Sequence, residues 1–397
     1  MSTPGEAPSG VPARYWHTLD DGRVQCDLCP RECRLRPGQR GFCFVRAAGQ
    51  DGLVLTTYGR SSGFCIDPIE KKPLAHFLPG TSVLSFGTAG CNLGCRFCQN
   101  HEISTSRHTD SLAAQASPEA VAVAAQEHGC RSVALTYNDP VIFAEYGIDV
   151  AQACRERGLA SIAVTAGYVQ GEARREFFAH MDAANVDLKG FTEEFYARVT
   201  GGRLATVLDT LTHLASSGVW LEITTLLIPG VNDSTAELEA MSSWLVAHLG
   251  PDVPHHFSAF NPDHRMTDVD RTPLATLLRA REIARAAGER YVYTGNVVNP
   301  EGEATRCPGC GLDVVERDRY RVLAYRLRVD PRVPRGRHEA RDAHDDRRGS
   351  EHGTRRYDHA RGRCPRCGHV VPGVFEESPG TFGPRRLPIT IGPRPAD

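Results

Sequence analysis

The sequence lacks any apolar run long enough to span a bilayer, and residues 1–12 lack the apolar stretch and the positive charges of a signal peptide. It also lacks an excess of charge of either sign, since 46 Lys and Arg residues oppose 48 Asp and Glu residues for a formal net charge of −2. Without a basic field, there is no electrostatic reason to expect nucleic acid or a membrane as a partner. We therefore expect a cytoplasmic protein, and 397 residues suffice for one large domain with appendages.

Cysteine, by contrast, is abundant: the chain has 14 cysteines, most of them in short clusters. In a large chain without signs of secretion, such clusters indicate metal binding rather than disulfides. Cys65, Cys130 and Cys154 stand outside the clusters, and we interpret them as small buried apolar side chains.

The most informative cluster lies in the segment 87–100, where Cys91, Cys95 and Cys98 form a C-x-x-x-C-x-x-C run with Phe97 directly before the third cysteine. A structural zinc site uses four ligands. Three thiolates on one loop instead suit three corners of an iron–sulfur cubane and leave its fourth iron open to a small molecule. A zinc loop whose fourth ligand lies elsewhere is the alternative.

This run and its aromatic residue resemble the signature of the radical S-adenosylmethionine (SAM) family. Other segments are similar to the pyruvate formate-lyase activating enzyme-like group, and within it to the radical SAM member of the AmmeMemoRadiSam system: 67–73, 98–100, 136–140 and 256–260. The resemblance runs from about residue 26 to residue 310 and resumes at residue 364. It implies a 4Fe–4S cluster on the three cysteines, SAM at the open iron with Phe97 near its adenine, and a partial α/β barrel.

Two groups of four cysteines flank this loop in the sequence. The N-terminal group has neighbouring Pro and Gly residues that allow tight turns, and it comprises Cys26, Cys29, Cys33 and Cys43. Four thiolates within so short a span fit a closed structural zinc site, and a second iron–sulfur cluster is the alternative because spacing alone does not fix the metal. The C-terminal group consists of two C-P-x-C knuckles typical of a zinc ribbon, with Cys307, Cys310, Cys364 and Cys367.

The order of apolar segments predicts an α/β fold. Apolar, β-branched strands are expected near 83–86, 132–136, 161–165, 185–188, 219–228, 256–260 and 291–293. Helices are expected between them, near 118–128, 143–157, 203–216, 235–248 and 273–286. Such alternation implies a parallel sheet with helices outside, and six or seven units suggest an incomplete barrel.

These elements divide the chain into four parts. We expect a disordered N-terminus over 1–14, a Cys-rich segment over 15–80, a radical SAM partial barrel over 81–300 and a zinc-ribbon-like tail over 301–397. The tail contains a low-complexity insertion at about 331–363, rich in Arg, acidic residues and His, which we expect to be disordered.

Polar residues at or beside the predicted strand ends are the candidate SAM ligands, because chemistry in α/β barrels gathers at the C-terminal ends of strands. By resemblance, these residues are Asn138, Asp139, Thr165, Asp187, Lys189 and His256. Asp139 also fits a helix N-cap before Pro140, and the two roles are compatible. Glu222 shares a strand face with Thr224, which fits either a site or a satisfied buried network.

The resemblance implies a radical SAM enzyme that reductively cleaves SAM to a 5′-deoxyadenosyl radical, which abstracts hydrogen from a substrate. One hypothesis is activation of a glycyl-radical enzyme, and a second is modification of a small molecule or a different protein in an AmmeMemoRadiSam system, with a Memo-like partner. A third is a non-catalytic iron–sulfur or zinc protein that binds or carries electrons. The first two require a low-potential electron donor of the flavodoxin or ferredoxin type.

Overall fold

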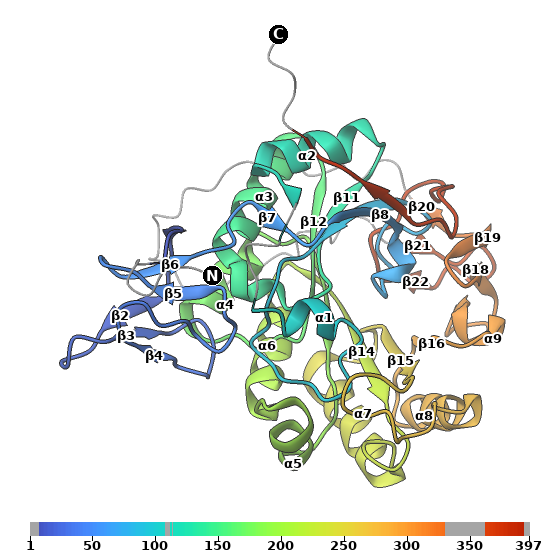
Figure 1. Cartoon of the computed structure of the whole chain (residues 1–397). Coiled ribbons are helices and arrows are strands. Elements are labelled where there is room, and N and C mark those ends of the chain that lie inside the picture. Colours follow the sequence, from blue (N-terminus) through green and yellow to red (C-terminus); the bar gives the residue numbers. More distant parts are fainter. Residues whose placement is uncertain (1–7, 108–111, 113, 330–361, 393–397) are drawn as a thin grey trace, which may run out of the picture.

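The computed structural model describes residues 8–107, 112, 114–329 and 362–392. Its centre is a nine-stranded sheet in the order β16-β15-β14-β13-β12-β11-β9-β8-β23 (Figure 1). Its parallel strands are β9 (Ser82–Phe86), β11 (Ser132–Leu135), β12 (Ala160–Thr165), β13 (Ala183–Asp187), β14 (Trp220–Leu227), β15 (His255–Ala259) and β16 (Val292–Gly295). Two antiparallel strands extend one edge, β8 (Phe64–Pro68) and β23 (Leu387–Ile389). The predicted α/β partial barrel is confirmed.

Helices connect successive parallel strands, as the apolar spacing predicts. They are α2 (Pro118–Glu127), α3 (Ala144–Glu156), α4 (Gly171–Ala179), α6 (Leu204–Ser216), α7 (Thr235–Leu249) and α8 (Leu274–Ala286). The start of α2 follows from its sequence, because the Ser117 hydroxyl accepts a hydrogen bond from Ala120 N at 3.2 Å and Pro118 occupies the first turn. Apolar residues of the sheet and helices form a large buried core and smaller clusters beside it. No described helix is long and apolar enough to cross a membrane.

A small all-β module precedes the barrel and lies to one side of it (Figure 1). It contains β1 (Val11–Pro12), β2 (Trp16–Thr18), β3 (Val24–Cys26), β4 (Arg34–Leu35), β5 (Arg46–Ala48) and β6 (Leu53–Leu55). The expectation of disorder over 1–14 is wrong for residues 8–14, because Val11 and Pro12 pair with Leu55 and Val54. Residues 1–7 lie outside the described part of the chain.

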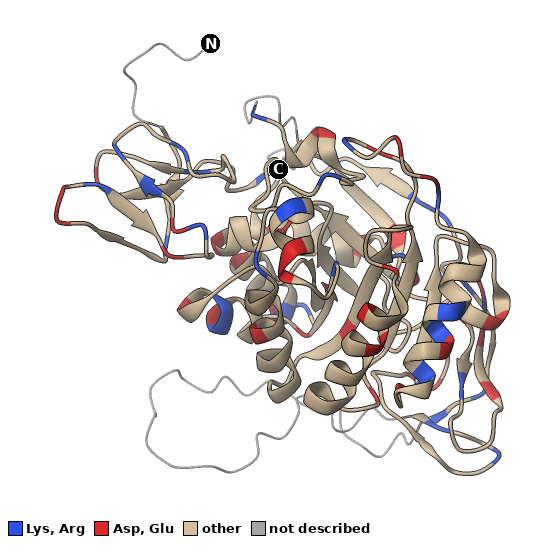
Figure 2. Ribbon diagram, turned by 90° about the horizontal axis from the view of Figure 1, so that it is seen from below, with Lys and Arg blue, Asp and Glu red and all other residues tan. Residues whose placement is uncertain are grey.

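A second all-β module follows the barrel. It contains β17 (Thr305–Arg306), β18 (Asp313–Asp318), β19 (Arg321–Tyr325), β20 (Arg328–Val329), β21 (Gly362–Arg363) and β22 (Val370–Val371). The predicted insertion at 331–363 lies outside the described residues, apart from Gly362 and Arg363, which form β21. Basic and acidic residues are interspersed over the described helices and loops, whereas most strands of the central sheet carry neither (Figure 2).

Candidate functional site

The three-cysteine loop follows β9 and is fixed to the barrel by backbone hydrogen bonds. Gly94 N donates to Thr200 O at 2.8 Å, and Arg96 N donates to Val199 O at 2.9 Å. Both acceptors belong to a π-helical turn, Tyr196–Thr200, a rare element that is frequent at functional sites. The loop is therefore held in place by the protein itself.

Asn138 braces the same loop. Its side-chain oxygen accepts from Thr88 N at 3.2 Å, and its amide nitrogen donates to Gly90 O at 2.7 Å. Gly90 has a φ of +81°, and a Cβ there would lie 2.0 Å from Cys43 O, so only glycine fits. The structure thus gives Asn138, a predicted SAM ligand, a role in shaping the loop.

The cysteines of the loop fit the iron–sulfur group that the sequence predicts. Cys91, Cys95 and Cys98 are all partly exposed, and three soft thiolates suit a cluster with one open iron. Burial of the thiol raises the pKa of Cys95 to about 11, although the charge of Lys189 opposes that shift. Thr88 Oγ1 is buried next to the loop and has no hydrogen-bond partner among the described residues, so hydrogen-bonding capacity remains for a bound group.

Asp139 and Thr165 meet beside the loop. Asp139 Oδ1 accepts from Thr165 Oγ1 at 2.7 Å, and Oδ2 accepts from Ala166 N at 3.3 Å. Its carboxylate also accepts from Val141 N at 3.3 Å, which confirms the N-cap before Pro140. Burial raises the pKa of Asp139, against the hydrogen bond from Thr165. The carboxylate therefore joins the ends of two neighbouring strands.

Asp187, Lys189 and Phe97 form a second group on the same side. Lys189 Nζ lies 2.8 Å from Asp187 Oδ2 and 5.8 Å from the centre of the Phe97 ring. Burial alone would lower the pKa of Lys189, but the charges of Asp187 and Cys95 raise it overall, so this ammonium stays charged. Phe97 itself is buried and packs 6.4 Å from the ring of Phe195. Asp187, Lys189 and Phe97, three of the predicted SAM ligands, thus lie together near Cys95.

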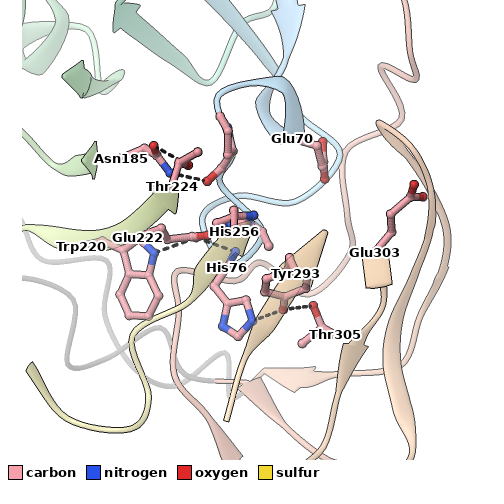
Figure 3. Close-up of polar contacts among 12 residues, drawn as sticks. Glu70, His76, Asn185, Trp220, Glu222, Thr224, His256, Tyr293, Glu303 and Thr305 are labelled. Carbon is pink, nitrogen blue, oxygen red and sulfur yellow. Dashed lines mark hydrogen bonds and ion pairs between the residues drawn. The ribbon is translucent and has the colours of Figure 1, made fainter. Parts of the chain in front are cut away.

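His256 lies in a buried network centred on Glu222 (Figure 3). His256 Nε2 is 2.7 Å from Glu222 Oε2, and its ring stacks on Tyr293 at 4.9 Å. Glu222 also accepts from the backbone N–H groups of Ala75 and His76, each at 2.8 Å. Burial would raise the pKa of Glu222, but the hydrogen bond and charge of His256 hold it below its usual range. The sequence allowed Glu222 either a place in a site or a satisfied buried network, and the structure shows the network.

His76 is a member of this network that sequence analysis missed. Its Nδ1 lies 2.7 Å from Pro372 O and its Nε2 lies 2.6 Å from Tyr293 Oη (Figure 3). Burial lowers the pKa of His76 to about 4, so its imidazole is neutral near pH 7. The available signal was its place within a charged, proline-bounded segment, residues 67–79. His76 joins the barrel to the C-terminal module.

A cavity of about 480 Å³ opens beside His256 and Tyr293. Its walls come from three parts of the chain, represented by Glu70 before the barrel, Ser258 and Asn296 at strand ends, and Tyr320 in the C-terminal module. Four basic side chains line it against two acidic ones, Glu70 and Glu303: the basic ones are Lys71, Arg271, Arg317 and Arg319. The cavity can accept a small ligand or an inserted side chain with negative charge.

The C-terminal cysteines form a compact ligand set. The donor atoms of Cys307, Cys310, Cys364 and Cys367 all lie within 4.8 Å of one another, with Cys307 Sγ 3.6 Å from Cys367 Sγ. Four thiolates about 2.3 Å from one tetrahedral zinc ion are separated by about 3.8 Å, so this set fits a single ion. The N-terminal cysteines lie together around a different pocket, lined by Cys26, Cys29, Cys33 and Cys43.

Comparisons with known proteins agree with this site. The model of the Radical SAM superfamily matches residues 86–241. "Uncharacterized protein MJ0808" of Methanocaldococcus jannaschii is 37% identical over 318 residues, which cover 80% of this chain and 95% of that protein. The benzylsuccinate synthase activating enzyme of Thauera aromatica is 27% identical over 189 residues, covering 44% of this chain and 57% of that enzyme.

A third relative is the pyruvate formate-lyase-activating enzyme of Clostridium pasteurianum, which is 22% identical over 205 residues and matches 48% of this chain and 85% of its own. The residues that the superfamily model matches include the whole loop with Cys91, Cys95 and Cys98. The chain therefore belongs to the radical SAM superfamily.

Proposed function

We propose that this chain is an enzyme that binds SAM at a 4Fe–4S cluster held by Cys91, Cys95 and Cys98, and that it abstracts a hydrogen atom from a glycyl residue of a partner protein. When bound, the cluster and SAM supply one-electron reductive cleavage to methionine and a 5′-deoxyadenosyl radical. The observation that supports this is the fixed three-thiol loop, together with the similarity to two activating enzymes. A protein that only carried electrons would not need polar strand ends arranged around that loop.

The protein's own contribution in this proposal is to position the ligand. Lys189 offers a permanent charge for the SAM carboxylate, and Asp187 offers an acceptor for a ribose hydroxyl. Asp139 uses its oxygens to hold Thr165 and the next peptide, so we assign it the shaping of the SAM pocket. Phe97 forms the apolar side of the SAM pocket, and the exclusion of water there protects a radical.

The second candidate function is radical modification of a small molecule or of another protein, as in an AmmeMemoRadiSam system with a Memo-like partner. The cavity favours this reading, because its 480 Å³ and its excess of basic side chains suit an anionic group. His256 lines that cavity as well as contacting Glu222, so it would lie near such a substrate.

We further propose that the compact C-terminal cysteines hold a structural zinc ion. The electron for SAM cleavage would come from a low-potential protein of the flavodoxin or ferredoxin type.

Anaerobic reconstitution with iron and sulfide, followed by SAM and dithionite, tests the central proposal. We expect 5′-deoxyadenosine from the wild type and none from Cys95→Ala, with Cys130→Ser as a buried control outside every cluster. A cluster-loaded wild type that yields no 5′-deoxyadenosine would rule the proposal out. Tritium transfer from a labelled glycyl-radical partner, compared with transfer from small anionic compounds, separates the two candidate substrates.

A further inference from the structure

The N-terminal cysteines line a pocket and do not form a compact ligand set like the C-terminal cysteines. Cys26, Cys29, Cys33 and Cys43 together line one small pocket. In the described part of the chain, the C-terminal cysteines form a compact group whose donor atoms all lie within 4.8 Å of one another, whereas the N-terminal cysteines do not form such a group. The N-terminal sulfurs are therefore more widely spaced than the C-terminal sulfurs.

This spacing distinguishes two kinds of metal group. A single zinc ion draws four thiolates to within about 3.8 Å of one another, because each lies about 2.3 Å from it. A cubane has one thiolate on each of its irons, so its ligands must stand further apart. Cys91, Cys95 and Cys98, which form the superfamily's motif, likewise make no compact set within the described chain. Neither the N-terminal four nor the three loop cysteines thus form a compact set like the C-terminal one in the described part of the chain.

A buried positive charge borders the same pocket. Arg46 lines it and is 1% exposed, and its two terminal nitrogens each lie 2.9 Å from an oxygen of Glu145. Arg46 Nε has no hydrogen-bond partner among the described residues. A buried donor without a partner needs an explanation, and an anionic group in the pocket would provide one.

The pocket also adjoins the radical SAM loop. Cys43 O lies 2.0 Å from the position that a Cβ of Gly90 would take, and Gly90 directly precedes Cys91. Arg31 Nε donates to Asn92 O at 2.9 Å. Asn92 also lines the pocket, and its Oδ1 has no hydrogen-bond partner in the part of the chain that the structure describes. The backbone of the N-terminal cysteine site is thus in direct contact with the backbone of the radical SAM loop.

We propose that Cys26, Cys29, Cys33 and Cys43 hold a second iron–sulfur cluster that relays electrons to the cluster on the radical SAM loop. In each transfer, one electron enters from a reduced flavodoxin or ferredoxin, which is oxidised, and one electron leaves to the loop cluster, with no atoms exchanged. The relay rests on the proposed function, whereas the identity of the metal group does not.

Metal analysis tests the cluster independently of activity. The full chain with C91A/C95A/C98A is reconstituted anaerobically and assayed for iron, sulfide and zinc. We expect about four iron and about four sulfide per chain, and a reduced electron paramagnetic resonance signal that SAM does not change. Adding C26A/C29A should remove that iron, and Cys130→Ser in its place should not. A triple variant without iron but with two zinc ions per chain would overturn the proposal.

The relay is tested by comparing two electron sources in R46Q/E145Q, which removes both buried charges together. We expect more than about tenfold loss of 5′-deoxyadenosine formation driven by reduced flavodoxin, little loss with dithionite, and a lower reduction potential of the N-terminal cluster. Equal rates with both sources in variant and wild type would overturn the relay. A wild type inactive with dithionite would overturn it together with the proposed function, whereas iron in the triple variant would still establish the second cluster.

Discussion

The two four-cysteine modules carry the same ligands but differ in how those ligands are arranged. In the C-terminal module, pairs of sulfur atoms from the two knuckles lie 3.6 Å apart. In the N-terminal module, the sulfurs surround a pocket that adjoins the radical SAM loop. A motif of four cysteines therefore predicts a metal but not its kind, because spacing in the chain does not fix the distance between sulfurs in space.

Each module makes a contact through a buried arginine, Arg46 with the barrel and Arg317 with the segment that precedes the barrel, and the two contacts also differ. Arg46 makes a two-point ion pair with Glu145 at 2.9 Å. Arg317 lies 3.6 Å from Glu70 and instead donates hydrogen bonds to Ala75 O and Thr305 Oγ1 at 2.6 and 3.0 Å. The N-terminal contact depends on charge, and the C-terminal contact on neutral acceptors.

The largest effect should follow loss of the C-terminal metal. Structural zinc in small modules contributes about 10 kcal/mol or more to folding, so Cys310→Ser should release one zinc ion and unfold the module. Hydrogen exchange should then rise across β18 and β19 while the helices of the barrel keep their protection. A variant that loses zinc but keeps protection in these strands would show that the module folds without metal.

Loss of the N-terminal ion pair should come next. Glu145→Gln removes the carboxylate that pairs with the buried guanidinium of Arg46 on the barrel side, which should cost about 3–5 kcal/mol in the free energy of unfolding. Glu176→Gln is the matched control, because its pair with Arg14 is partly exposed and should be worth less than about 1 kcal/mol. Urea denaturation measures both, and equal costs would contradict a charge-dependent contact.

Much of the fold was predictable, because periodic apolar segments determine it locally. Every predicted strand and helix of the barrel has a counterpart in the structure. Helix α4 was missed because it is short and buries just Ala173, Phe177 and Phe178, which makes its apolar pattern weak. Pairing of Val11 with Leu55 was also missed, because it depends on a partner far along the chain.

The site was predictable only in part. The cysteine loop and the strand-end residues follow from a motif and from the order of strands. The partners of those residues do not, since Asn138, Asp139 and His256 all bond to groups distant in sequence. His76 and Arg317 were missed because their roles arise where the C-terminal module meets the barrel.

Acid should weaken the C-terminal contact first. Burial lowers the pKa of His76 from 6.5 to about 4, so below pH 6.5 the unfolded chain binds a proton that the folded chain does not. Stability should therefore fall by roughly 3 kcal/mol as the pH drops from 6.5 to 4. Thermal melts across this range should show a smaller slope for His76→Gln, whereas the exposed His128→Gln should keep the wild-type slope. Identical slopes for all three proteins would contradict the assignment.

The smallest effect should come from Glu70→Gln, the counterpart of Glu145→Gln at the other module. Burial raises the pKa of Glu70, and its Oε1 accepts from Gly80 N at 2.8 Å, a bond that a glutamine oxygen can keep. Arg317 retains its three neutral acceptors, so we expect a cost of about 1 kcal/mol or less near pH 7. Because the folded pKa is raised, the wild type should lose stability as the pH rises above the unfolded pKa near 4.5, and the variant should not. Denaturation at pH 5 and pH 7 measures this difference, and a cost equal to that of Glu145→Gln would mean that charge holds both modules alike.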